Sequence, residues 1–171
     1  MVSAYPRRMI DVRRATVDDA AELVRLRGVL FGVPTDSDEG GWRQPSRQIL
    51  ERRLAEESPT MAGFLVDQPP GAAAGDQGRL AACAVGIVEE RLGKPHNAHG
   101  LTGYVFNVAT DPEHRRRGYA RACVTALLDW FRSQGCGAAD LRASPDAEPL
   151  YTSLGFVRTS DPAMRTRLPL D

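Results

Sequence analysis

Three consecutive arginines followed by a glycine, Arg115 to Gly118, have the chemistry of an anion-binding site. Residues 104–110 before them are rich in β-branched and aromatic types, which predicts a strand. In residues 118–133 after them, apolar side chains recur at three- and four-residue spacings, which predicts a helix. The first N–H groups of a helix lack intrahelical acceptors, and the helix dipole adds partial positive charge there. A glycine at this point lets a phosphate approach the backbone, so residues 115–120 are predicted to bind a phosphorylated ligand.

The residues of this segment also allow other interpretations. A basic run at the start of a helix is often only solvated surface, but the strand before it and the small Ala120 favour a binding site. The chain has no G-x-x-x-x-G-K-S/T sequence and no G-x-G-x-x-G after a strand. The sequence therefore favours neither a P-loop nor a dinucleotide-binding fold.

Two segments resemble the GNAT N-acetyltransferase superfamily. Arg115, Gly118 and Ala120 match its signature Q/R-x-x-G-x-G/A position by position. Residues 151–156 are similar to the Tyr-x-x-x-Gly-Phe stretch of the family, in which a short helix ends at the glycine and a strand follows. The resemblance covers nearly the whole chain, with its specific motifs in residues 104–156, and it implies one GNAT-like domain over residues 1–171.

The resemblance also implies a cosubstrate, acetyl-CoA, and a set of site residues. Loop amides would hold its pyrophosphate, and backbone N–H groups at the end of the preceding strand would stabilise an oxyanion. Tyr151 occupies the family's position for the acid that protonates the departing thiolate. The residues implied in cosubstrate binding are Val108, Ala109, Thr110, Arg115, Arg116, Arg117, Gly118, Tyr119 and Ala120.

The base that takes the proton of the attacking amine is not settled by the resemblance. Glu89 and Glu90, at the end of a predicted strand, are the candidates, acting directly or through water. With Asp36, Asp38 and Glu39 they would make the acceptor cleft acidic and attract a cationic amine. One departure concerns the asparagine that many members place before the tyrosine, because residues 144–147 read Ser-Pro-Asp-Ala here.

Three functions stay open at this point. The first is acetylation of a small primary amine, and the second is acetylation of a protein N-terminus or a lysine in a peptide. The third is a non-catalytic CoA-binding module, which would have no use for an acid such as Tyr151 beside the sulfur. Assembly as a homodimer also stays open.

Composition sets further limits. The chain has 171 residues, with 22 basic and 22 acidic side chains and a formal net charge of zero, which argues against a nucleic-acid partner. No apolar run is long enough for a membrane span, and no signal peptide is evident, so we expect a cytoplasmic location. Cys83, Cys123 and Cys136 form no C-x-x-C pair and are expected to be reduced. No metal is expected, although His96 and His99 are three residues apart in a loop.

The predicted fold is a single α/β domain with a mixed, mostly antiparallel sheet and helices on both faces. The resemblance also implies a splayed central strand pair. A polar loop is expected at 32–41 and a hairpin loop at 67–76. Strands are predicted at 9–14, 61–66, 80–90, 102–110, 138–143, 156–160 and 164–168. Helices are predicted at 16–30, from 44 or 46 to 55, at 118–133 and at 148–153.

Overall fold

The computed structural model describes residues 9–69 and 78–168. In this part of the chain one sheet contains β1 (Arg13–Arg14), β2 (Met61–Asp67), β3 (Leu80–Glu90), β4 (Leu101–Val105), β5 (Ala109–Thr110) and β6 (Ala138–Leu141). The strand order is β1-β2-β3-β4-β6, and β5 pairs with β3. Only the β4–β6 pair is parallel, so the sheet is mixed and mostly antiparallel, as the sequence predicts.

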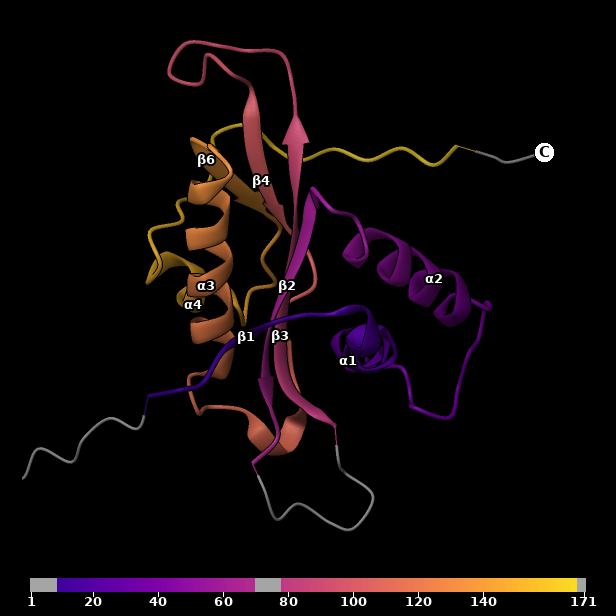
Figure 1. Cartoon of the computed structure of the whole chain (residues 1–171). Coiled ribbons are helices and arrows are strands. Elements are labelled where there is room, and N and C mark those ends of the chain that lie inside the picture. The colour runs from indigo at the N-terminus through magenta and orange to yellow at the C-terminus, as the bar shows by residue number, and fades with distance from the viewer. Residues whose placement is uncertain (1–8, 70–77, 169–171) are drawn as a thin grey trace, which may run out of the picture.

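Helices cover both faces of this sheet (Figure 1). α1 (Ala20–Phe31) and α2 (Arg43–Leu54) lie over one face, and their apolar residues form a core with Leu65 and Val85 of the sheet. α3 (Tyr119–Ser133) and α4 (Glu148–Thr152) belong to the core on the opposite face. Two separate cores therefore enclose the central strand β3, which explains why its residues are almost continuously apolar.

The strand predicted over 102–110 is interrupted, so that part of the prediction is wrong. The amides of Phe106 and Asn107 both donate to the carbonyl oxygen of Val85, at 3.0 and 3.4 Å. Two residues facing one is the pattern of a β-bulge, which bends a strand and ends its regular pairing. The parallel pairing with β6 stops at Val105 and Leu141. Beyond the bulge the chain stays paired only with β3, which produces the splayed strand pair that the resemblance implies.

The two C-terminal strand predictions are also wrong. Residues 156–160 and 164–168 have no regular secondary structure, and in Figure 1 the last described residues extend away from the sheet toward the C-terminus. Val157, Met164 and Leu168 are exposed, so no burial supports a strand here. Pro162 lies between the two ranges and lacks the N–H that a ladder requires.

Other boundaries differ less from the predictions. The first strand is confined to residues 13–14, and the strand predicted to end at 143 ends at Leu141. Before the first helix, the Asp19 carboxylate accepts the Thr16 N–H at 2.8 Å, a contact of the capping-box type. The helix itself begins one short 3-10 turn later than predicted, at Ala20. The predicted loop at 67–76 lies largely outside the described residues.

Phe131 of α3 packs directly on two glycines of the sheet, Gly86 and Gly103. A Cβ placed on Gly103 would come within 2.5 Å of the Phe131 ring, which cannot shift freely because it is fully buried. We therefore expect Gly103→Ala to lower the free energy of unfolding by about 1–3 kcal/mol through overpacking. Denaturant unfolding measures this, with Gly137→Ala as the matched control, because the nearest atom to a Cβ there is 3.9 Å away. Equal stabilities of the two variants would contradict the prediction.

Candidate active site

The loop between β5 and α3 has a backbone shaped to receive an anion. A 3-10 turn, Pro112–His114, follows β5, and Arg116 and Gly118 then take left-handed conformations with φ of 61° and 81°. Left-handed residues in such loops turn successive N–H groups toward one point and create an anion-binding concavity. Within the described chain, the amides of Arg116, Arg117 and Gly118 have no hydrogen-bond acceptor. The loop therefore presents free donors at the start of α3.

The three arginines add uncompensated positive charge to these donors. Arg115 and Arg117 donate only to backbone carbonyl oxygens, of Thr110 at 3.4 Å and of Glu113 at 3.3 Å. None of the three forms an ion pair with a carboxylate in the described ranges. The loop borders a hollow of about 220 Å³, which the residues at 110, 114–116, 118–121 and 150 line. The structure thus gathers Thr110, Arg115, Arg116, Gly118, Tyr119 and Ala120 around one hollow.

His114 is a residue of this hollow that the sequence did not single out. Its side chain is buried, with 8% of the residue exposed, and neither ring nitrogen has a hydrogen-bond partner among the described groups. The ring packs on Tyr119, with 6.4 Å between centroids. A histidine next to three arginines gives no signal of burial in the sequence. The 3-10 turn that ends at His114 places this residue among those that line the hollow.

A buried ionic network fixes the loop to α1. The Arg25 guanidinium donates to the Asp111 carboxylate at 2.8 Å, to Glu22 at 2.9 Å and to the Leu80 carbonyl oxygen at 2.9 Å. Asp111 stands immediately before the 3-10 turn, so this network sets the direction in which the loop leaves the sheet. Arg25 and Asp111 are 86 residues apart along the chain, and the sequence contains no motif that pairs them.

Tyr151 lies on α4 and is buried against Phe156, with ring centroids 5.8 Å apart. Burial raises the pKa of its phenol, so the hydroxyl keeps its proton at neutral pH. Gly155 lies three residues after the end of the helix with φ of 90°, a left-handed conformation that glycine tolerates. Tyr151 therefore has the protonation state that a general acid requires.

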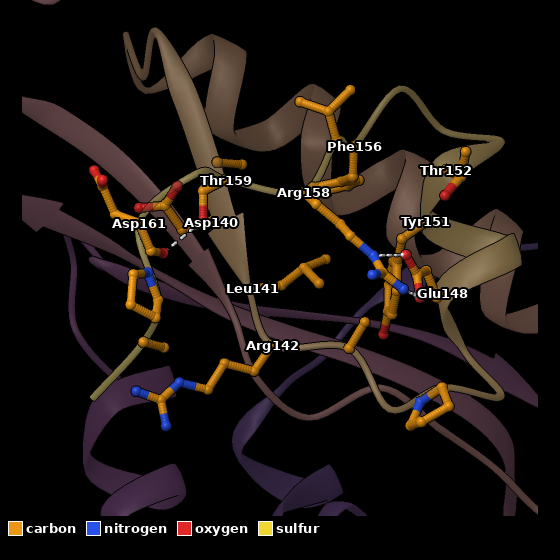
Figure 2. A pocket seen from close by; sticks show the side chains of 16 residues that line it. Asp140, Leu141, Arg142, Glu148, Tyr151, Thr152, Phe156, Arg158, Thr159 and Asp161 are labelled. Atoms are coloured by element: carbon orange, nitrogen blue, oxygen red, sulfur yellow. Dashed lines mark hydrogen bonds and ion pairs between the residues drawn. The ribbon is translucent and has the colours of Figure 1, made fainter. Parts of the chain in front are cut away.

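Tyr151 borders a second, larger hollow of about 500 Å³ between β6, α4 and the C-terminal segment. Figure 2 shows Tyr151 and the Arg158–Glu148 ion pair on one side of it and Asp140 and Asp161 on the other. Leu150, next to Tyr151, lines the smaller hollow instead. α4 thus separates the two hollows, and Tyr151 does not line the one that holds the arginine loop.

The expected oxyanion donors, Val108 to Thr110, directly follow the bulge. Val108 packs into the same core as Tyr151 and Leu150. Ala109 and Thr110 pair with Cys83 and Ala82 of β3, and Ala109 is buried on the α1 side. The bulge therefore reverses the alternation of side chains between the two faces of the sheet. The backbone after the bulge still pairs with β3.

Glu89 and Glu90 lie at the opposite end of β3 from the arginine loop. They pair with Thr102 and Leu101, four or five residues beyond the Val85 carbonyl that marks the bulge. At about 3.3 Å per residue this is about 13 Å or more along the strand. Glu89 also forms an ion pair with Arg91, which in turn pairs with Asp140. The structure does not bring either glutamate beside Val108–Thr110, so a base here would act through water.

Cys83 and Cys123 are buried free cysteines, while Cys136 is half-buried. Burial raises the pKa of Cys83 to about 12, so its thiol is not a nucleophile at neutral pH. Over residues 9–69 and 78–168, no cluster of His, Cys, Asp or Glu has the makings of a metal site. No helix in these ranges is both long and apolar enough to cross a membrane.

Comparison with known proteins identifies the class to which this fold and loop belong. Residues 34–156 match the acetyltransferase (GNAT) family, and the chain therefore belongs to that family. The match includes the bulge, the arginine loop and Tyr151, and it confirms the resemblance of the sequence motifs.

Several individual proteins are similar to this chain. A mycothiol acetyltransferase of Arthrobacter sp. (strain FB24) is 30% identical over 116 residues, which are 66% of this chain and 33% of that protein. The chain thus matches about a third of the length of this curated relative. A GCN5-related N-acetyltransferase from Ralstonia eutropha JMP134 has a similar fold, with a TM-score of 0.73 and 24% identity over 91% of this chain and 97% of that one. An acetyltransferase of Clostridium acetobutylicum solved with acetyl-CoA has a TM-score of 0.75 and 20% identity over 92% and 96% of the two chains.

Proposed function

We propose that this protein is an N-acetyltransferase that moves an acetyl group from acetyl-CoA to a primary amine. The observation that carries the proposal is the loop at 115–120, where unpaired amides, uncompensated arginines and a left-handed glycine border one hollow at the start of α3. These donors suit the pyrophosphate of acetyl-CoA, because a helix N-terminus and arginine side chains both bind phosphate oxygens. Membership of the acetyltransferase family supports the same choice of cosubstrate.

The chemistry needs few protein groups because the thioester is already activated. The neutral amine attacks the thioester carbon directly and forms a tetrahedral intermediate, and its oxyanion accepts hydrogen bonds from backbone amides of residues 108–110. Collapse of this intermediate breaks the C–S bond, and Tyr151 gives its proton to the departing thiolate. The amine loses its own proton to water or to a base, so the products are an amide and free CoA.

Glu89 and Glu90 are kept as candidate bases that act through water. They lie on opposite faces of β3, and Glu89 is on the face that α1 and α2 cover. We expect Glu89→Gln to raise the acceptor KM or to move the pH–rate profile, because it removes the negative charge on that face. Affinity for acetyl-CoA should not change. Steady-state kinetics from pH 6.5 to 9 measure this, with Glu90→Gln as the matched substitution on the other face. If neither variant changes acceptor kinetics, both residues lose their proposed role.

Incubation with acetyl-CoA and a panel of amines, reading the release of free thiol, tests the function itself. Turnover with small amines supports the proposal, whereas turnover only with peptides supports a protein N-terminal or lysine acetyltransferase. Binding of acetyl-CoA by calorimetry without turnover on any acceptor would instead identify a non-catalytic CoA-binding module. Absence of both binding and turnover would overturn the proposed function altogether.

A further inference from the structure

Arg27 of α1 reaches the bulge between β4 and β5. One of its terminal N–H groups donates to the Oδ1 atom of Asn107 at 3.3 Å. Asn107 is buried, with 3% of the residue exposed, and its side-chain amide also lies 3.8 Å from the Cys83 sulfur. The bulge thus turns the Asn107 side chain toward α1, where it accepts a hydrogen bond from the Arg27 guanidinium.

The charge of Arg27 is not neutralised within the described residues. Among the described residues its only other partner is the Phe31 ring, whose centroid is 4.9 Å from the guanidinium carbon. Loss of hydration lowers the pKa of this half-buried group, in contrast to its neighbour Arg25, which has the carboxylates of Glu22 and Asp111. A partly buried cation without a counter-ion is unfavourable, because little replaces the water that it loses. An anion bound beside Arg27 would remove that penalty.

Arg27 lies close to the segment at which the acceptor amine would react. Asn107 directly precedes the segment 108–110, where the proposed function places the thioester carbonyl. Arg27 approaches Asn107 from the face of the sheet that α1 and α2 cover, whereas Tyr151 belongs to the core on the other face. A group bound to Arg27 would therefore lie on the opposite side of the splayed strands from Tyr151, where it would not compete for space with the leaving thiolate.

We infer that Arg27, held at the bulge by Asn107, binds an anionic group of the acceptor, so that the preferred substrate is an amine that also carries a carboxylate or a phosphate. This inference rests on the proposed function and narrows its substrate class. Phe31, 59% exposed, and Trp42 form an edge-to-face pair beside Arg27, with centroids 6.4 Å apart. These rings offer apolar contact to the body of such an acceptor. The cleft would then contain a positive charge beside the expected acidic residues. A zwitterionic acceptor could pair its ammonium group with the acids and its anionic group with Arg27.

The test compares amines that differ only in the anionic group. Phenylalanine is paired with phenylalaninamide to test a carboxylate, and phosphoethanolamine with ethanolamine to test a phosphate. For one of these pairs we expect kcat/KM to favour the anionic member by about ten- to a hundredfold, the range of a charge-assisted hydrogen bond. Arg27→Gln should abolish that preference by lowering kcat/KM for the anionic amine alone, and Arg27→Lys should keep part of it. Arg47→Gln is the control, because Arg47 is an exposed arginine of α2 paired with Glu51.

Further readouts separate this role from a structural one. Affinity for acetyl-CoA and the melting temperature are measured for each variant, since a loss confined to packing at the bulge would lower kcat/KM for both members of a pair equally. Equal loss for both members, or no preference for either anionic amine in the wild type while neutral amines are acetylated, overturns the inference and leaves the proposed function intact. No thiol release with any acceptor overturns the proposed function and the inference together.

Discussion

Tyr151→Phe should lower kcat by about ten- to a thousandfold while acetyl-CoA affinity stays within about twofold. The substitution removes only the hydroxyl, and the ring keeps its edge-to-face packing on Phe156. Without this hydroxyl, the departing thiolate would have to take its proton from water. Access of water is restricted because Tyr151 is buried. Thiol release under saturating substrates gives kcat, and calorimetry with CoA gives the affinity.

The pH dependence sharpens this test. Because burial raises the pKa of Tyr151 above its ordinary value of about 10, the phenol stays protonated from pH 7 to 9. Over this range the rate should rise with pH as the amine loses its proton, and the ratio of wild-type to Tyr151→Phe rates should stay constant. Thr152→Val, which removes an exposed hydroxyl from the same helix, is the control and should behave as wild type. Equal turnover of the wild type and Tyr151→Phe would refute the role of the acid.

Gly118→Val should weaken acetyl-CoA binding by more than about a hundredfold. Gly118 has φ of 81°, a conformation that a β-branched residue avoids, so valine would turn the loop amides away from their common point. Loss of two hydrogen bonds to a charged phosphate accounts for an effect of this size. Calorimetric titration with CoA measures the affinity directly.

A matched glycine separates binding from backbone strain. Gly40, in the loop between α1 and α2, also has φ of 81°, and a Cβ there meets no atom within 4 Å. Gly40→Val therefore introduces the same local strain, of about 1–3 kcal/mol, at a point remote from the arginine loop. We expect both variants to lose similar stability and only Gly118→Val to lose affinity. If a folded Gly118→Val protein binds CoA as the wild type does, the loop is not the phosphate site.

Long, strongly patterned elements could be predicted from the sequence, whereas the marginal strands could not. The periodicity of 118–133 predicts the bounds of α3 within a residue. One face of that helix is continuously apolar, so the pattern is visible without knowledge of the residues that pack on it. Residues 156–160 and 164–168 have a strand-like composition, but apart from Phe156, which packs on Tyr151, their side chains are exposed and the segment stays irregular. The bulge at 106–107 leaves no mark in the composition, since it arises from pairing with Val85 of another strand.

The candidate site divides in the same way. The sequence by itself determined the arginine loop, because its parts are contiguous and their effect depends on the local backbone at Arg116 and Gly118 and on the helix that follows. Only the tertiary structure decided the long-range contacts: it buried His114 beneath the loop, joined Arg25 to Asp111, and brought Arg27 to Asn107, 80 residues away. The physical reason is that a local conformation depends on neighbours along the chain, whereas the neutralisation or desolvation of a charge depends on groups that folding alone brings together.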